Sequence, residues 1–217
     1  MPEEKTPDAA ASLGDAPLAC IYCTHTTENY ADQDRNAQAG GVLQAARVLA
    51  DTLNAKGVPA ILCETVHDAP DWSKAYEASF RSIQSLKTQY PTLTLFVDVH
   101  RDSAVAGVST RLSRQGESWA KMMFVVGSNQ RLQHDRWQEN RAFAQKAADL
   151  LEEKAPGIVR DVRVSANRYN QQISPQALLV EVGSNDNAQA EAERSAALLG
   201  EALAEILFAQ AKAESPA

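Results

Sequence analysis

The sequence predicts an α/β fold: a single domain built on a mainly parallel twisted sheet with helices on both faces. A length of 217 residues with 44% hydrophobic residues suits one domain with a sizeable buried core. Strand-like and helical segments alternate along the chain, as in folds built from strand-helix-strand units. Most strand-like segments are continuously apolar, which is typical of parallel strands covered on both faces.

The first half of the chain contains three expected strands and two expected helices. Residues 17–23 form the first strand-like run. In "GGVLQAARVLADTLNAKG", apolar residues recur at helical spacing from Val42 to Leu53, and the pattern stops at Gly57. "VPAILCE" is strand-like, and "DWSKAYEASFRSIQSLKTQYP" is a helix that must end before Pro91. "TLTLFVDV" is a strand rich in β-branched and aromatic residues.

The second half continues the alternation. "KMMFVVG" predicts a strand, and a long helix follows around Asp135 to Lys154. "IVRDVRV" and "QALLVEVG" predict two more strands, and an Ala-rich helix from about Ala188 to Ala213 closes the chain. The Pro-, Ala- and acid-rich start predicts a flexible linker over residues 1–16. The domain itself is expected to span residues 17–213.

Composition excludes several classes of function. The chain has 28 acidic and 21 basic residues and a net charge of −7, which argues against binding nucleic acid or anionic membrane. Its three cysteines lack the paired CxxC motifs of a metal knuckle. Since Cys20 and Cys23 lie in an apolar run, we interpret them as buried small side chains. No stretch reaches the ~18 apolar residues of a membrane span. The chain is therefore either cytoplasmic or anchored by an N-terminal segment outside it.

Histidine and glutamate side chains cluster at the carboxyl ends of three expected strands. His25 and Glu28 follow the first strand, His100 directly follows "TLTLFVDV", and Glu181 lies in "QALLVEVG". Ligands of open α/β sheets gather at these ends. Two imidazoles and a carboxylate, with a fourth position left for water, are the donor set of a catalytic zinc. We therefore predict a Zn²⁺ site formed by His25, Glu28 and His100, in which one tight turn of "HTTE" aims the first two at one ion.

Each of these residues has a simpler interpretation. His25 could cap a turn or be solvated, and Glu28 could be an ordinary loop carboxylate. His100 could be a core histidine bonded to Asp98, although Asp98 could equally orient a metal-binding His100. His67 and His134 lie in polar sequence next to helices and are interpreted as surface residues, with His67 at most at the rim of the site.

Glu181 is the hardest of these residues to explain as structural. A carboxylate within an apolar strand costs several kcal/mol to bury, by a rough general figure, unless it is paired or functional. A carboxylate held in a cleft in this way is a candidate general base.

The motifs "IYCTHTTENY", "AYEASFRSI", "FVDVHRDS", "AKMMFVVGSN", "PGIVRDV", "YNQQIS" and "LLVEVGSNDN" resemble, in order, those of the stage II sporulation protein P family. The resemblance covers residues 18–207. It implies a zinc amidase- or carboxypeptidase-like fold and a zinc-dependent N-acetylmuramoyl-L-alanine amidase. Such an enzyme hydrolyses peptidoglycan, and also stem-peptide cross-links, during engulfment in sporulation. It further implies an extracytoplasmic, membrane-anchored protein that works beside a lytic transglycosylase.

Carried over to this chain, the family's first-strand histidine corresponds to His25, its "DVHRD" histidine to His100 and its strand-end glutamate to Glu181. Glu28 as third ligand is our own inference, supported by similar HxxE arrangements in carboxypeptidase-like enzymes. Relatives often have "YHTHTTE", so Cys23 replaces a histidine here, and we expect it to be peripheral. Arg101 is expected to pair with a substrate carboxylate or steady the oxyanion, and Asn170 to contact a substrate amide.

Two other functions fit the residues. A carboxypeptidase-like zinc hydrolase of small N-acyl amino acids would need a closed pocket, whereas a wall hydrolase needs an open groove. The sequence has no long lid insertion, which favours the groove. A non-catalytic peptidoglycan-binding module is the third candidate, and the presence of all four proposed site residues argues against it.

Overall fold

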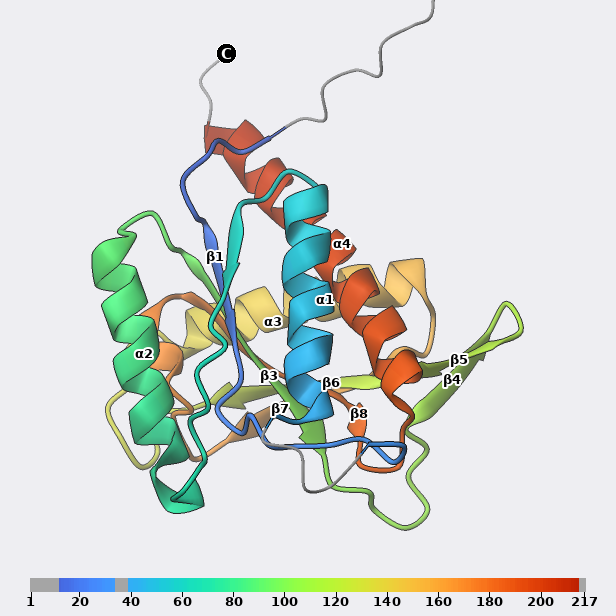
Figure 1. Cartoon of the computed structure of the whole chain (residues 1–217). Coiled ribbons are helices and arrows are strands. Elements are labelled where there is room, and N and C mark those ends of the chain that lie inside the picture. The colour runs from blue at the N-terminus through green and yellow to red at the C-terminus, as the bar shows by residue number, and fades with distance from the viewer. Residues whose placement is uncertain (1–11, 34–38, 215–217) are drawn as a thin grey trace, which may run out of the picture.

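A computed structural model describes residues 12–33 and 39–214 of the chain. Six strands form one sheet in the order β2-β1-β3-β8-β6-β7 (Figure 1). These strands are β1 (Ala19–Tyr22), β2 (Ala60–Leu62), β3 (Leu95–Asp102), β6 (Met122–Gly127), β7 (Val159–Ser165) and β8 (Gln176–Ser184). The helices are α1 (Gly41–Ala55), α2 (Ala75–Gln89), α3 (Trp137–Lys154) and α4 (Gln189–Glu214), with short 3-10 turns η1 (Trp72–Lys74) and η2 (Gln171–Ile173).

The sheet is mainly parallel, as the sequence predicts. The pairs β1–β2, β1–β3, β3–β8 and β6–β7 are parallel, and only β6–β8 is antiparallel. All the strands and helices expected from the sequence are present, with ends that differ from the predicted ones by a few residues. The fold prediction is therefore confirmed, and the structure adds that β1, β3 and β8 lie side by side in the sheet.

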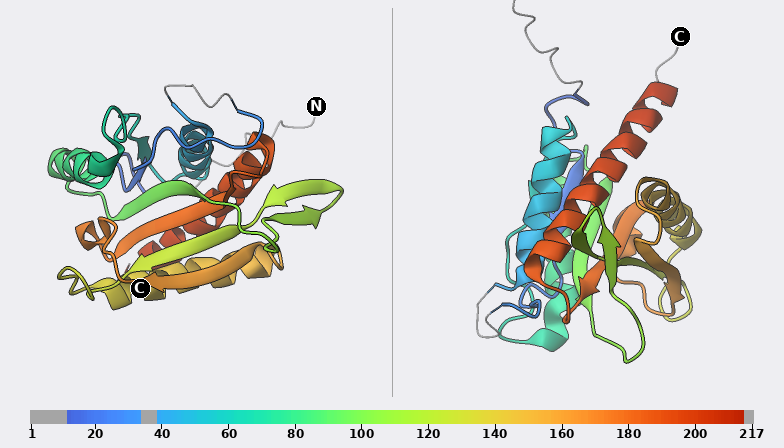
Figure 2. Two further views of the ribbon diagram at one scale, coloured as in Figure 1. Left: turned by 90° about the horizontal axis from the view of Figure 1, so that it is seen from below. Right: turned by 90° about the vertical axis from the view of Figure 1, so that its right-hand side faces the viewer.

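Alternate residues along each strand pack on opposite faces of the sheet. Leu95, Val97 and Val99 of β3 lie in the large core that α1, α3 and α4 cover. Phe96 points to the other face, where α2 contributes Ile83 to a smaller core. Figure 2 shows the helices arranged on the two sides of the twisted sheet. The continuously apolar strands are explained by this double covering.

A two-stranded hairpin, β4 (Arg111–Arg114) and β5 (Glu117–Ala120), was not among the predicted elements. Its strands are short, polar and partly exposed, so they lack the apolar pattern that marks the other strands. The hairpin turns at Gln115 and Gly116, both with positive φ, as a two-residue turn between twisted strands requires. The turn residues therefore specify this hairpin more than the residues of its two strands do.

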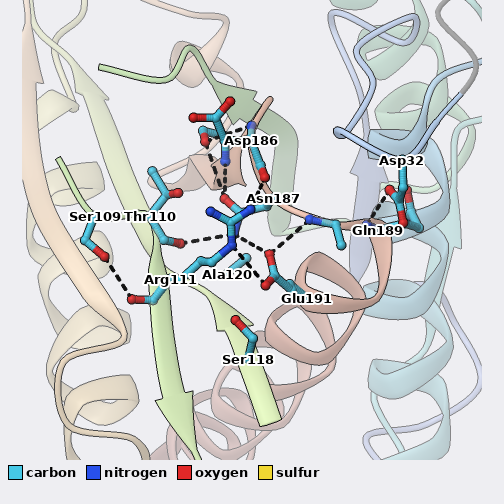
Figure 3. Close-up of polar contacts among 12 residues, drawn as sticks. Asp32, Ser109, Thr110, Arg111, Ser118, Ala120, Asp186, Asn187, Gln189 and Glu191 are labelled. Carbon is cyan, nitrogen blue, oxygen red and sulfur yellow. Dashed lines mark hydrogen bonds and ion pairs between the residues drawn. The ribbon is translucent and has the colours of Figure 1, made fainter. Parts of the chain in front are cut away.

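Polar contacts attach this hairpin to the start of α4 (Figure 3). Arg111 Nε donates to Glu191 Oε1 at 3.1 Å, and the Asn187 amide donates to Glu191 Oε2 at 2.8 Å. Glu191 also accepts from the backbone N–H of Ala188, which caps the first turn of the helix. Ser195 Oγ donates to Ala120 O at 2.7 Å. These bonds hold the hairpin against the start of α4, so we assign this cluster a structural role.

The predicted linker over residues 1–16 falls mostly on residues 1–11, which lie outside the described residues. Of the remainder, Leu13 donates its backbone N–H to Gly57 O at 2.9 Å and packs against the main core. Across residues 12–33 and 39–214, none of the helices combines the length and apolar character needed to cross a bilayer.

Candidate active site

The predicted site residues meet at the carboxyl ends of β1, β3 and β8, on the face of the sheet that carries α2. His100 of β3 is the register partner of Glu181 of β8, so the two side chains leave neighbouring strands on the same face. His25 and Glu28 come from the loop that follows β1, the other neighbour of β3. The order β1-β3-β8 within the sheet is what brings together residues that are far apart in the sequence.

The "HTTE" segment forms one tight turn. The backbone N–H of Glu28 donates to His25 O at 3.1 Å, closing the turn. The start of α1 holds it in place, because Gly40 N–H donates to Thr26 O at 2.7 Å and Val42 N–H to Glu28 O at 3.2 Å. A side chain at Gly40 would place its Cβ 1.9 Å from Glu28 O. Glycine is therefore required where the helix start meets the turn.

Glu28 points back across the end of β3. Its Oε2 accepts the backbone N–H of Arg101 at 3.0 Å and lies 3.7 Å from His100 Nδ1. The β3–β8 pairing shifts register between His100 and Asp102. This irregularity frees the N–H of Arg101 from the strand ladder, and such bulges are frequent next to active sites. Glu28 is thus positioned toward the His100 ring by backbone geometry.

Asp98 orients His100. It is fully buried, its Oδ1 and Oδ2 accept the backbone N–H and hydroxyl of Thr24 at 2.7 and 2.6 Å, and its Oδ1 lies 3.1 Å from His100 Nε2. Burial alone would lower the pKa of His100, but the negative charge of Asp98, with help from Glu28 and Glu181, outweighs burial and raises it to about 10. Nε2 lies beside Asp98 without hydrogen-bond geometry, and the Nδ1 atom of His100 faces Glu28. A metal ion bound at Nδ1 would displace the proton that the raised pKa keeps on the ring.

His25 is held by aromatic rings. Its ring stacks on Trp72 of η1 at a centroid distance of 4.4 Å and an angle of 7°, and meets Tyr76 of α2 edge-on at 5.6 Å. Its ring lies 5.3 Å from that of His100, nearly perpendicular. Burial, followed by the positive charge of His100, lowers the pKa of His25 to about 4, so the ring is neutral at pH 7. The His25 Nδ1 atom is buried and has no hydrogen-bond partner.

Glu181 completes the group. Its Oε2 is also buried without a hydrogen-bond partner. Burial raises the pKa of Glu181 to about 7, a shift that the positive charge of His100 opposes and that Glu28, Asp102 and Asp98 reinforce. A carboxylate with a pKa near neutrality can both take up and release a proton under ordinary conditions.

The donor set of this site fits a zinc ion. Within the part of the chain that the structure describes, no three His, Cys, Asp or Glu side chains are already arranged to hold a metal ion. However, His25 Nδ1 is buried without a partner, and His100 Nδ1 faces the Glu28 carboxylate 3.7 Å away, too far for a hydrogen bond. Two imidazoles and one carboxylate are ordinary zinc ligands, and a buried neutral nitrogen without a partner is the kind of group that a cation satisfies.

Arg101 and Asn170 both have structural partners. Arg101 Nε donates to Asn29 O at 3.1 Å, which ties the guanidinium to the loop after β1. Asn170 donates its side-chain amide to Tyr76 O at 2.8 Å and to Ser79 Oγ at 3.1 Å, and it has a left-handed backbone with φ of 58°. Asn170 therefore attaches the loop before η2 to α2, beside the site.

Cys23 points away from these residues. Its side chain is buried in the main core under α1, on the opposite face of the sheet from His100. Burial, with a further contribution from the charge of Asp98, raises the pKa of the Cys23 thiol well above its ordinary value. The thiol is therefore protonated and packed among apolar side chains.

The interpretation of His67 and His134 as surface residues is wrong. His67 is 3% exposed and His134 1% exposed. His67 Nδ1 donates to Cys23 O at 2.8 Å, and its Nε2 lies 3.0 Å from Ser82 Oγ. His134 Nδ1 donates to Gly127 O at 3.1 Å. Cys23 directly follows β1 and Gly127 is the last residue of β6, so both histidines donate to backbone carbonyls at strand ends. Polar neighbours in the sequence do not reveal this role.

Sequence reasoning also missed the aromatic side of the site. Trp72 is 64% exposed although its ring stacks on His25, and Tyr76 lies between His25, His100 and Tyr169. The signal was an aromatic pair four residues apart at the start of the second predicted helix. Only the packing of that helix against β1 and β3 shows that this pair faces the histidines.

Comparisons with known proteins show which family the chain matches. The family model described as "Stage II sporulation protein P (SpoIIP)" matches residues 2–204. The stage II sporulation protein P of Bacillus subtilis (strain 168) is 26% identical over 91% of this chain and 53% of its own length, so the chain spans about half of that relative.

Solved structures give a second comparison. The N-acetylmuramyl-L-alanine amidase Ami1 of Mycobacterium smegmatis is similar with a TM-score of 0.59 and 12% identity, over 92% of this chain and 100% of that one. The N-acetylmuramoyl-L-alanine amidase of Clostridium difficile 630 is similar with a TM-score of 0.58 and 14% identity, over 93% and 100%. At these identities the likeness shows a shared fold.

Proposed function

Because this chain belongs to the stage II sporulation protein P family, we propose that it hydrolyses peptidoglycan during sporulation, cutting the N-acetylmuramoyl-L-alanine amide bond in a zinc-dependent reaction. One observation carries the proposal: Glu181, with its pKa near neutrality, leaves the sheet beside His100, which faces Glu28 and His25. The amidase-like fold supports the same chemistry.

In this proposal His25, Glu28 and His100 hold the ion, through the two Nδ1 atoms and the carboxylate. Bound zinc supplies a Lewis acid that lowers the pKa of water and polarises the amide carbonyl. Asp98 keeps His100 turned toward the ion, and the stacking of Trp72 fixes the ring of His25. The bond from Arg101 N–H to Glu28 prevents that carboxylate from turning away.

Glu181 is the general base and acid of the reaction. As the oxygen of water adds to the amide carbonyl carbon, the carboxylate takes up a proton from that water. As the carbon–nitrogen bond breaks, it returns the proton to the leaving nitrogen, so the amine departs neutral and Glu181 is restored. Arg101 stays in the proposal as a group that steadies the developing oxyanion through the guanidinium nitrogens that do not bond Asn29.

We also propose the location and the partner that membership of the family implies. The chain would act outside the cytoplasm, anchored by a segment that lies outside the described residues, and beside a lytic transglycosylase that opens the glycan strands. Purification of the chain with the wall-degrading complex from sporulating cells, followed by identification of its partners, tests this setting separately from the chemistry.

Digestion of purified sacculi with metal-replete protein tests the reaction. Mass spectrometry of the products distinguishes the bonds: amidase activity releases stem peptides with a free L-alanine amine, whereas cross-link cleavage leaves the stems attached to muramic acid. Hydrolysis of short N-acyl amino acids with intact sacculi would instead support the carboxypeptidase-like function. If wild-type protein with bound zinc releases nothing from sacculi, the proposed function is wrong.

A further inference from the structure

The structure points to a carboxylate-binding subsite next to the candidate active site, and this inference rests on the proposed function. We propose that Arg131 and Arg168 bind a free carboxylate of the peptide part of the substrate, and so favour acidic stem peptides over amidated ones. The two arginines line a cavity of about 380 Å³. Neither residue belongs to the group around His100 and Glu181.

The cavity lies next to the active site, with Tyr76 as a common wall. This ring lines the cavity, lies 6.4 Å from the ring of His100 and stacks nearly parallel to it. On its other side it meets Tyr169, another lining residue, at 5.6 Å. Tyr169 packs on Leu179, which precedes Glu181 by two residues and faces the same side of the sheet. A substrate bound at Glu181 that extends along this face of the sheet would therefore reach toward Tyr169 and the cavity.

The loop that forms the cavity wall is held in a fixed shape. Tyr169 and Asn170 both have left-handed backbones, with φ of 52° and 58°. A tyrosine in this conformation is strained, and strain of this kind concentrates at functional sites. Gln171 fastens the loop to β6, because its side chain accepts from Gly127 N–H at 2.8 Å and donates to Val125 O at 2.7 Å.

Gly127 lets this loop approach the strand. A Cβ at this position would lie 2.5 Å from the carbonyl oxygens of both Asn167 and Arg168. The backbone that carries Arg168 therefore lies directly against β6. Since binding groups on a preorganised backbone lose little entropy when a ligand arrives, this wall suits ligand recognition.

Among the residues that the structure describes, neither guanidinium group has a carboxylate partner. Arg131 Nη1 donates to Asn167 Oδ1 at 2.9 Å, and Arg168 Nη1 donates to Gln133 O at 3.0 Å, both neutral acceptors. No ion pair within 4.0 Å joins either arginine to an acidic side chain of the described residues, in a chain with a net charge of −7. By contrast, Arg136 and Arg160 pair with Glu139 and Asp102. Two free positive charges in one cavity beside the site favour an anionic ligand.

The other residues that line the cavity favour an acidic peptide as its ligand. Leu132, 56% exposed, also lines the cavity and offers an apolar contact. Tyr76 and Tyr169 add flat rings, which suit the aliphatic stem of an amino acid side chain. Guanidinium groups bind carboxylates through paired, charge-assisted hydrogen bonds. A peptide carboxylate on an aliphatic stem could bind the two guanidinium groups and also contact Leu132 and the two tyrosine rings.

The test compares two synthetic muramoyl peptides that differ only in their carboxylates, one free and one amidated. For Arg131→Gln and Arg168→Gln we expect KM for the acidic substrate to rise about tenfold each with kcat unchanged, as loss of a charged hydrogen bond implies. KM for the amidated substrate should stay the same in every protein. Arg131→Lys, which keeps the charge, should recover part of the loss.

Arg141→Gln is the matched control, since Arg141 is an exposed arginine of α3, outside the lining of this cavity. Thermal melting of each variant shows whether it is folded. Calorimetric binding of the acidic peptide to chains carrying Glu181→Gln gives a second readout without turnover. If wild-type protein cleaves both substrates, and the two arginine variants keep the wild-type KM for the acidic substrate, the subsite is wrong while the proposed function stands. If wild-type protein cleaves neither substrate nor sacculi, the proposed function fails, and absence of calorimetric binding then overturns the subsite as well.

Discussion

His100 and Glu181 are register partners on the adjacent parallel strands β3 and β8, so their side chains project from neighbouring positions on one face of the sheet. This relationship places a carboxylate with a pKa of about 7 next to an imidazole that Asp98 orients. The roles assigned to the two residues differ: His100 holds the ion, and Glu181 moves the proton.

Glu181→Gln should abolish hydrolysis and leave zinc bound. The amide is nearly the same size as the carboxylate but cannot take up a proton, so only the base is lost, and a fall in kcat of about 10²–10⁴-fold is expected. Release of stem peptides from sacculi measures turnover, and elemental analysis measures zinc. Turnover close to that of the wild type would show that another group is the base.

His25→Ala and His100→Ala should each lose both zinc and activity, because each removes one of three proposed ligands. Metal-replete wild-type protein should contain about one zinc per chain. Elemental analysis after dialysis, with activity on sacculi measured in parallel, checks both expectations.

His67→Ala is the informative control for these variants. It should keep zinc, but it removes one of the two donors to Cys23 O, the other being the Thr26 hydroxyl, and so should lower the free energy of unfolding by about 0.5–1.5 kcal/mol. Chemical denaturation measures this loss. If His67→Ala also loses zinc in proportion to its loss of stability, the assignment of His25 and His100 as the zinc ligands is wrong.

Asp98→Asn should weaken zinc binding by about 10–100-fold without removing it, the usual effect of losing a group that orients a metal-binding histidine. The amide keeps the volume of the carboxylate and one acceptor oxygen, so Thr24 retains one partner. Competition with a chelator of known affinity measures the change. An unchanged affinity would mean that the position of His100 does not depend on Asp98.

Cys23→Ser should leave zinc content and rate within a few-fold of the wild type, because the thiol lies in the core under α1. The hydroxyl is more polar in the same apolar surroundings, so the free energy of unfolding should fall by about 1–3 kcal/mol. X-ray absorption at the zinc edge gives an independent check on the wild-type protein. A zinc–sulfur distance near ~2.3 Å, or a rise in rate in the variant, would make Cys23 a ligand.

Gly40→Ala should reduce activity strongly, since its Cβ would lie 1.9 Å from Glu28 O and must displace the turn that carries His25 and Glu28. Zinc affinity should fall together with activity. Ala39→Ser, at the exposed neighbouring position, is the control and should change neither. A Gly40→Ala protein with normal zinc affinity would show that the turn can move without affecting the ligands.

Much of the fold was predictable because it depends on local patterns. Continuous apolar strands, helical spacing and stops such as Gly57 and Pro91 specify each element within its own segment. The β4–β5 hairpin was missed because its strands are polar and short, and its stability comes from contacts with α4 such as that between Arg111 and Glu191. The sequence around Gln115 and Gly116 held the only local signal, a two-residue turn.

The sequence by itself determined which chemical groups stand at the strand ends: His25, Glu28, His100 and Glu181, with Asp98 as a candidate partner of His100. Tertiary structure alone decided which groups surround them. The order of strands set the neighbours of β3, and the packing of α2 brought Trp72 and Tyr76 against the two histidines. Burial of His67 and His134 was likewise decided by distant carbonyls that needed donors. The physical reason is that a side chain's partners come from contacts across the sheet, whereas sequence patterns report only the segment in which the residue lies.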